Sequence, residues 1–198
     1  MNQTNKKATI FCASSSKLRQ VFFDEARELT NMLVSNGYGI VYGGGSVGLM
    51  GCVADEALRM EGEVIGIIPQ FMVDVEWQHR GVADMRLTQT MAERKRLLID
   101  LADVIFILPG STGTMDELFD AMADKKLGLL HKPIIILNTD GFYSSLRQQL
   151  QKMVDENFMK QCHLDTVYFA SSPADAMNYL SSADANGGNL TLLDAAVK

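Results

Sequence analysis

Residues 103–117 read DVIFILPGSTGTMDE, a short apolar run that leads through a loop of small residues into a longer pattern. The run at 103–108 is apolar almost throughout, which predicts a strand buried on both faces. Pro109 and Gly110 end that strand, and the hydroxyl and glycine residues that follow are typical of the start of a helix. A strand that turns through such a loop directly into a helix indicates an α/β protein with a parallel sheet.

The same alternation runs along the rest of the chain. Further strands are predicted at 8–13, 39–42, 63–68, 133–137 and 166–169, with a short one at 86–88. Helices are predicted at 18–36, 49–61, 91–101, 114–127, 143–157 and 174–180. The stretch 69–85 is expected to be irregular. We therefore expect an α/β fold, a Rossmann-like doubly wound parallel sheet in a single domain over 1–180, with a flexible tail over 181–198.

Composition and charge narrow the classes of function. The chain has 198 residues, 47% hydrophobic and 21% charged, which suits one globular domain with a sizeable core. Its net charge of −6 argues against a nucleic-acid partner, because phosphate backbones are bound by basic surfaces. No apolar stretch is long enough for a signal peptide or a membrane span, so no membrane contact is expected.

The cysteines favour a reducing compartment. Cys12, Cys52 and Cys162 are scattered along the chain and form neither a CxxC pair nor a metal-ligand pattern with the histidines. Sparse, unpaired cysteines of this kind are typical of reducing compartments. The protein is therefore predicted to be cytoplasmic and to hold no metal.

The loop that follows the strand at 103–108 is a candidate phosphate site. Small residues and hydroxyls at a helix N-terminus, where backbone N–H groups are unpaired, favour the binding of phosphate. The candidate ligands are Gly110, Ser111, Thr112, Gly113 and Thr114. The loop lacks the Gly-Lys-Ser/Thr ending of a P-loop, so hydrolysis of a nucleoside triphosphate is not expected.

Glu117, three residues after Thr114, has two interpretations. The pair matches a capping box, in which the glutamate side chain only closes the helix end. A helical wheel places four apolar residues on the buried side and Glu117 away from it, facing either solvent or the ligand crevice. Those apolar residues are Met115, Leu118, Phe119 and Met122. The pattern alone does not choose between a helix cap and a functional carboxylate.

Two more segments that follow predicted strands are candidates for ligand contact. Residues 43–51 read GGGSVGLMG, and glycines such as Gly44 and Gly45 let a backbone approach a nucleotide or sugar closely. The run also fits the dinucleotide pattern GxGxxG, but a proline and a glutamine stand where that pattern needs an acidic residue, which disfavours an NAD site. A tight structural turn is the other interpretation. After the first strand, Ser14 could hold phosphate or ribose, or belong to a helix cap.

Arg94 lies on the apolar side of the helix predicted over 91–101. Successive residues step about 100° around a helix axis, which places Arg94 among Met91, Leu97, Leu98 and Leu101. A guanidinium there needs an anion or several acceptors to offset its desolvation. A bound nucleotide or an active-site carboxylate would serve. So would a structural acid, or a position at the edge that lets the side chain reach solvent.

Three blocks together resemble the LONELY GUY (LOG) family, the cytokinin riboside 5′-monophosphate phosphoribohydrolases that were long labelled lysine decarboxylases. The blocks are GGGSVGLMG at 43–51, MAERK at 91–95 and PGSTGTMDE at 109–117, the last similar to the family's PGGxGTxxE. The similarity extends over 8–158. It implies a nucleotide-binding catalytic domain, usually a homodimer, that uses no metal and no redox cofactor.

The resemblance implies that Arg94 and Glu117 form the catalytic pair. It implies hydrolysis of the N-glycosidic bond of a nucleoside 5′-monophosphate, AMP or an N6-substituted AMP, to a free base and ribose 5-phosphate. The residues expected to bind substrate or phosphate are Ser14, Gly44, Gly45, Met91, Lys95, Gly110, Ser111, Thr112, Gly113 and Thr114, of which Gly110, Gly113 and Thr114 match the family's phosphate-binding residues.

Two positions depart from the family pattern. Ser111 stands where glycine is usual, which restricts positive φ in the loop, and Asp124 stands where many members have tryptophan, which affects pocket shape or dimer packing. The alternative function is that of a non-catalytic protein of the same fold that binds a nucleotide or the molybdenum cofactor. The presence of both Arg94 and Glu117 favours the enzyme.

Overall fold

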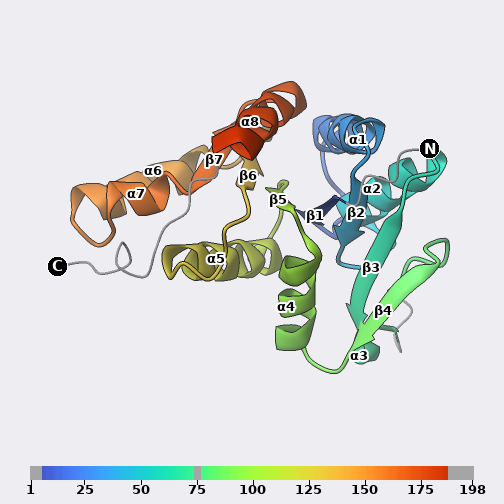
Figure 1. Ribbon diagram of the computed structural model, residues 1–198. Coiled ribbons are helices and arrows are strands. Elements are labelled where there is room, and N and C mark those ends of the chain that lie inside the picture. Colours follow the sequence, from blue (N-terminus) through green and yellow to red (C-terminus); the bar gives the residue numbers. More distant parts are fainter. Residues whose placement is uncertain (1–5, 74–76, 187–198) are drawn as a thin grey trace.

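A computed structural model describes residues 6–73 and 77–186 (Figure 1). One seven-stranded parallel sheet runs through them in the order β4-β3-β2-β1-β5-β6-β7. The strands are β1 Lys7–Phe11, β2 Gly39–Tyr42, β3 Val64–Pro69, β4 Asp84–Thr88, β5 Val104–Ile107, β6 Ile134–Leu137 and β7 Val167–Ala170. The inner strands are largely buried, as their apolar, β-branched sequences predict.

Helices follow most of the strands. They are α1 Gln20–Ser35, α2 Gly48–Arg59, α3 Gln70–Val73, α4 Met91–Leu101, α5 Thr112–Lys126, α6 Ser144–Asp155, α7 Gln161–Leu164 and α8 Pro173–Asn186, with a 3₁₀ turn η1 at Thr139–Gly141. None of the described helices is long and apolar enough to cross a membrane.

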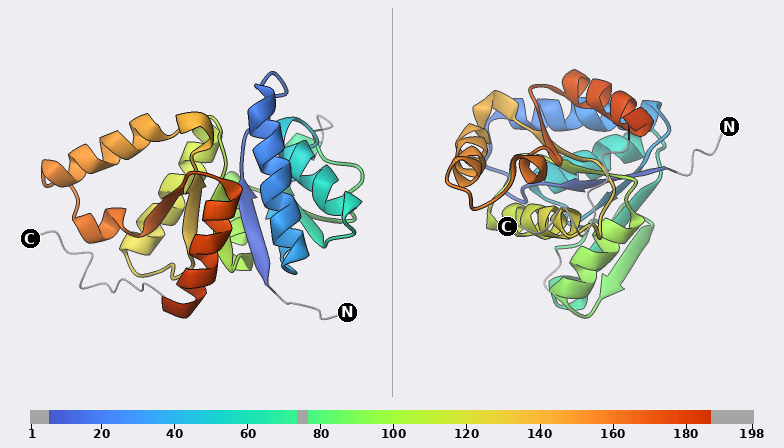
Figure 2. Two further views of the ribbon diagram at one scale, coloured as in Figure 1. Left: turned by 90° about the horizontal axis from the view of Figure 1, so that it is seen from above. Right: turned by 60° about the vertical axis from the view of Figure 1, so that its left-hand side comes forward.

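The helices cover both faces of the sheet (Figure 2). On one face α1, α2 and α8 pack over a core that includes Leu29 and Val53. On the other face α4, α5, α6 and α7 pack over a second core that includes Leu98 and Leu118. The Rossmann-like, doubly wound parallel sheet expected from the alternating pattern is therefore confirmed.

The strand order reverses between β1 and β5. The chain builds outward from β1 to β4, and β5 then pairs with the free side of β1. Connections on the two sides of this point leave for opposite faces, which opens a crevice at the carboxyl ends of the strands. The segments that follow β1, β2 and β5 carry the predicted site residues other than Met91, Arg94 and Lys95 of α4, so the topology gathers them at this crevice.

Several boundaries differ from those predicted. The stretch expected to be irregular contains α3 and the first two residues of β4, whose other three residues were predicted as a short strand at 86–88. The mixed sequence of β4 lacks the apolar run of a central strand because β4 lies at the sheet edge. α5 begins at Thr112, two residues earlier than predicted. α8 continues to Asn186, so residues 181–186 are helical and were wrongly assigned to the tail, since no glycine or proline interrupts them. The rest of the predicted tail, 187–198, lies outside the described residues.

Candidate active site

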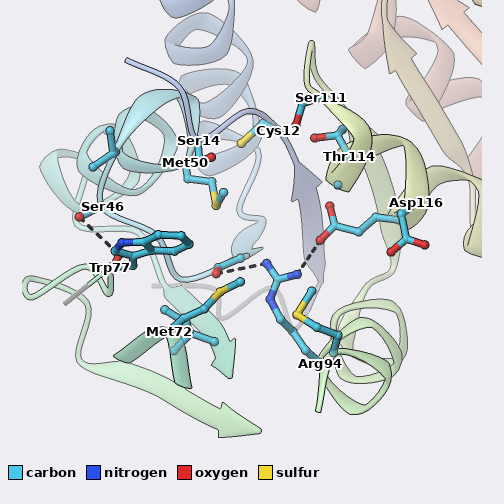
Figure 3. Close-up of a pocket in the computed structure, with 17 residues that line it drawn as sticks. Cys12, Ser14, Ser46, Met50, Met72, Trp77, Arg94, Ser111, Thr114 and Asp116 are labelled. Carbon is cyan, nitrogen blue, oxygen red and sulfur yellow. Dashed lines mark hydrogen bonds and ion pairs between the residues drawn. The ribbon is translucent and has the colours of Figure 1, made fainter. Parts of the chain in front are cut away.

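A cavity of about 420 Å³ opens at the carboxyl ends of β1, β2, β3 and β5 (Figure 3). It lies at the point where the strand order reverses, as expected for this class of sheet. Eight of the predicted site residues line it: Ser14, Gly45, Met91, Arg94, Ser111, Gly113, Thr114 and Glu117. The fold thus brings together residues from four separate segments of the chain.

A buried ion pair between Arg94 and Glu117 lines this cavity. The Arg94 Nη1 donates to Glu117 Oε1 at 2.7 Å, and the two residues are only 6% and 8% exposed. Arg94 Nε also donates to the carbonyl of Ile67 at 3.1 Å, and Nη2 to that of Gly43 at 3.3 Å. The acceptors that an arginine on an apolar face requires are therefore one carboxylate and two carbonyls at strand ends.

Gly43 has a steric reason to be glycine. A Cβ atom at this position would collide with the Arg94 guanidinium. The first glycine of the 43–51 block therefore makes room for the arginine, and its carbonyl accepts a hydrogen bond from the same group. The glycine contributes to the site through backbone geometry and not through contact with a phosphate.

Glu117 does not belong to a capping box. Ser111 is the N-cap of α5, and no side chain caps it, so Glu117 lies in the second turn and cannot close the helix end. The sequence left two directions open for the Glu117 side chain, solvent or a ligand crevice. The structure shows the second, because the side chain lines the cavity. The wheel was wrong about Phe119, which is 44% exposed. A helical wheel ranks residues by hydropathy and does not show which sides of the helix the rest of the fold covers.

Burial raises the pKa of Glu117, while the Arg94 guanidinium opposes the shift by attraction and by its hydrogen bond. Glu117 therefore has a higher pKa than an exposed glutamate. A carboxylate of this kind accepts a proton more readily than an ordinary one, which suits general-base chemistry. The structure thus combines a fixed position with a shifted pKa in one side chain.

The N-terminus of α5 presents unpaired N–H groups to the cavity. Met115 N–H donates to the carbonyl of Ser111, but no acceptor among residues 6–73 and 77–186 is found for the N–H groups of Thr112, Gly113 and Thr114. Unpaired donors at a helix start, where the dipole is positive, favour an anion. The space beside Gly113 is open, so a ligand can approach the backbone there.

The second glycine loop is built differently. The N–H groups of Leu49 and Met50, at the start of α2, donate to the carbonyl of Ala13 at 2.9 and 3.3 Å. These donors are therefore used by the chain itself, in contrast to those of α5. Gly44 has φ +78°, and a Cβ there would lie 2.9 Å from Ile68 Cβ, so this glycine is required by a tight turn. The loop supports the cavity wall, and the N–H groups of Leu49 and Met50, unlike those of Gly113 and Thr114, have an acceptor within the described part of the chain.

Comparisons with known proteins identify the family. A family model described as "Possible lysine decarboxylase" matches residues 50–180. The cytokinin riboside 5′-monophosphate phosphoribohydrolase LOG5 of Arabidopsis thaliana is 38% identical over 170 residues, which cover 85% of this chain and 73% of that protein. The chain belongs to the LOG family. The probable phosphoribohydrolase LOGL1 of Oryza sativa subsp. japonica is 39% identical over 151 residues, 76% of this chain and 68% of that protein.

Solved structures share the fold of this LOG-family chain. The molybdenum cofactor binding protein of Rippkaea orientalis matches with a TM-score of 0.70 at 21% identity, covering 90% of this chain and 98% of that one. The molybdenum cofactor carrier protein of Chlamydomonas reinhardtii matches with a TM-score of 0.71 at 18% identity, covering 91% and 99%. At these identities the likeness concerns the fold alone.

Four predicted binding residues of the LOG motifs do not line the cavity: Gly44, Lys95, Gly110 and Thr112. Lys95 Nζ pairs with Asp116 at 2.9 Å and with Asp120 at 2.6 Å, and hydrogen bonds to these carboxylates raise its pKa. Gly110 lies against Thr114, whose side chain a Cβ atom at Gly110 would strike. Lys95 and Gly110 thus contact residues that line the cavity.

The two departures from the LOG pattern have local explanations. Ser111 has φ −94° and ψ −160°, an extended conformation that serine adopts without strain, so glycine is not required there. Asp124 Oδ2 lies 3.7 Å from Arg96 Nη1 at the outer side of α4 and α5, away from the residues that line the cavity. Neither substitution disturbs the arrangement of Arg94 and Glu117.

Sequence reasoning missed the apolar wall of the cavity. Val47, Met50, Ile68, Met72 and Trp77 line it, with Trp77 opposite Thr114 in Figure 3. The carbonyl of Trp77 accepts the N–H of Ser46 at 3.1 Å, and the tryptophan is 59% exposed. This long-range pairing has no local sequence signal.

Cys12 and Asp116 were also missed as cavity residues. Cys12 follows β1 directly, so its place at a strand end was a usable signal. Burial raises the pKa of the Cys12 thiol, and Glu117 raises it further, which keeps it protonated and disfavours a nucleophilic role. Asp116 lies beside Glu117 in sequence, and its carboxylate pairs with Lys95 on the same side of the cavity.

Proposed function

We propose that this protein hydrolyses the N-glycosidic bond of a nucleoside 5′-monophosphate, AMP or an N6-substituted AMP, releasing the base and ribose 5-phosphate. One observation carries the proposal: the buried Arg94–Glu117 pair faces the same cavity as the unpaired N–H groups at the start of α5. A carboxylate and an anion site in one cavity suit a phosphorylated sugar. The names of the LOG-family relatives support the same activity.

The substrate would lie across the cavity. The N–H groups of Thr112, Gly113 and Thr114 would bind the 5′-phosphate, with Ser111 and Thr112 side chains nearby, and this anchor would orient the ribose toward Glu117. The base would lie against the apolar wall that includes Met50 and Trp77. Such a wall accommodates a flat ring, since aromatic and methionine side chains make good contacts with it.

The chemistry follows from the charge that develops. As the bond between the anomeric carbon and the base nitrogen breaks, positive charge grows on the ribosyl ring, and the Glu117 carboxylate stabilises it. The carboxylate also accepts a proton from the water whose oxygen bonds to the anomeric carbon. The departing base nitrogen takes up a proton and Glu117 returns to its carboxylate form, so that one water is divided between ribose 5-phosphate and the base. Arg94 holds Glu117 in place and favours its ionised form, which burial disfavours. No metal or cofactor is required by this scheme.

AMP is expected to release adenine without added metal, and adenosine is expected to react at least about 100-fold more slowly in kcat/KM, because it lacks the anchoring phosphate. The measurement is an incubation of the pure protein with AMP, other nucleoside monophosphates and adenosine, with the products separated by chromatography. Equal rates for AMP and adenosine would refute the phosphate site. If no monophosphate released a base, a non-catalytic nucleotide-binding protein of this fold would be the better description.

We also propose that the protein is a cytoplasmic homodimer with one catalytic domain that extends to the end of α8 at Asn186. The exposed side chains of Phe119, Leu127 and Leu129, on and after α5, support an interface, because several large apolar side chains exposed along one short segment favour an interaction site. The free thiols of Cys12, Cys52 and Cys162 support a reducing compartment. Light scattering at micromolar concentration is expected to give twice 21.8 kDa or a multiple of that dimer, and a monomer mass would contradict the proposal.

A further inference from the structure

The segment that leads into α5 is held by three hydrogen bonds. Leu108 N–H donates to the carbonyl of Phe11 at 2.9 Å, and Ala13 N–H donates to the carbonyl of Pro109 at 3.2 Å. Both bonds tie the segment to β1 and its end. The third comes from a side chain: the hydroxyl of Tyr143 donates to the carbonyl of Leu108 at 2.8 Å. These contacts fix the position of the backbone at Leu108, four residues before α5 begins.

Tyr143 is itself firmly placed. It lies between η1 and α6, is 2% exposed, and its N–H donates to Asn138 Oδ1 at 2.7 Å. Its ring packs edge-on against Phe142, with centroids 4.9 Å apart. Burial raises the pKa of Tyr143, and the backbone N–H of Gly110, which interacts with the same hydroxyl, opposes that shift. The hydroxyl therefore stays protonated and donates to the carbonyl of Leu108, at the start of the turn at 108–110.

We propose that Tyr143 is a positioning residue for the phosphate site at the start of α5. It does not line the cavity and touches no substrate, but it fixes the carbonyl of Leu108, two residues before Gly110, and Gly110 lies against Thr114. Hydrogen bonding to an anion depends steeply on donor direction, so a loosened turn would misplace the N–H groups of Thr112, Gly113 and Thr114. The inference rests on the proposed function only in assuming that these groups hold the 5′-phosphate.

The test compares Tyr143→Phe with Tyr42→Phe, which also removes one buried tyrosine hydroxyl. Tyr42 is fully buried at the end of β2, and its hydroxyl has no hydrogen-bond partner among the described residues. For Tyr143→Phe, the KM for AMP is expected to rise about tenfold, with kcat changed by less than about twofold and kcat/KM for adenosine unchanged. Tyr42→Phe should match the wild type in all three values.

Calorimetric titration with ribose 5-phosphate separates this inference from the proposed reaction. The Kd of ribose 5-phosphate is expected to rise about tenfold in Tyr143→Phe and to stay constant in Tyr42→Phe, whether or not the wild type releases a base from AMP. A Tyr143→Phe protein that melts lower but binds ribose 5-phosphate like the wild type would overturn the positioning role. So would an equal loss of affinity in both variants, or a wild type that does not bind ribose 5-phosphate.

Discussion

Glu117→Gln is expected to fold, to bind AMP and to lose turnover by about 10²–10³-fold. The amide keeps an oxygen that can accept the hydrogen bond from Arg94, but it carries no charge to stabilise a ribosyl cation and no basic site for the proton of water. Steady-state kinetics with AMP and a calorimetric titration with the same nucleotide measure the two effects separately.

The stability of Glu117→Gln is expected to change little. Burial raises the pKa of Glu117 in spite of Arg94, so the neutral amide avoids a desolvation cost that offsets the lost attraction. A net change of about 1 kcal/mol would move the Tm by about 2–4 °C. A large drop in Tm with unchanged turnover would make Glu117 a structural partner of Arg94 and would remove it from the mechanism.

Asp124→Asn is the matched control for Glu117→Gln. It neutralises a carboxylate on the same helix, but Asp124 lies outside the cavity and pairs only loosely with Arg96. Its turnover should stay within about twofold of the wild type, since surface pairs of this kind contribute about 0–1 kcal/mol. Asp116→Asn is a poorer control, because Asp116 lines the cavity and holds Lys95.

Arg94→Met is expected to abolish turnover and also to destabilise the fold by about 3–5 kcal/mol. The substitution leaves the buried Glu117 carboxylate without its counter-charge and removes the donor from two strand-end carbonyls, those of Ile67 and Gly43. The Tm should fall by roughly 6–20 °C, from the same estimate and the usual dependence of Tm on stability. Thermal denaturation and AMP hydrolysis below the new Tm measure both losses.

A double variant separates the two roles of Arg94. Combining Arg94→Met with Glu117→Leu removes the unpaired charge and fills the site with apolar groups, so most of the lost stability should return. Turnover should not return, because no carboxylate remains. Arg94→Lys keeps the charge but cannot serve three acceptors from one planar group, and it should be folded and slow. Wild-type turnover in Arg94→Met would show that the arginine serves only the fold.

Much of the fold could be predicted from the chain because its elements carry local signals. The apolar runs at 39–42, 104–107 and 134–137 alternate with helical patterns, and parallel strands between helices have few alternative arrangements. The edge strand β4 was predicted only over 86–88 and the short helix α3 was missed, since neither has a strong period. The start of α5 was placed two residues late because Thr114 resembled an N-cap.

For the candidate site, the sequence by itself determined which residues required an explanation. Arg94 on an apolar face needed acceptors, and Glu117 needed either a cap or a crevice, as helical periodicity and desolvation alone require. Only the tertiary structure decided that Arg94 and Glu117 pair with each other, across 23 residues of sequence. The carbonyls of Gly43 and Ile67 are the other acceptors of Arg94. Such contacts depend on which strands pair in the sheet, and no local sequence pattern predicts them.

The same division holds for the two glycine loops. Both read from sequence as possible anion sites, because glycine-rich turns before helices leave backbone N–H groups unpaired. In the folded chain the carbonyl of Ala13 accepts hydrogen bonds from the N–H groups of Leu49 and Met50 at the start of α2. The N–H groups of Gly113 and Thr114 at the start of α5 have no acceptor among the described residues. Which helix end binds an anion depends on which carbonyl lies against it, and that follows from the packing of β1 between its neighbours.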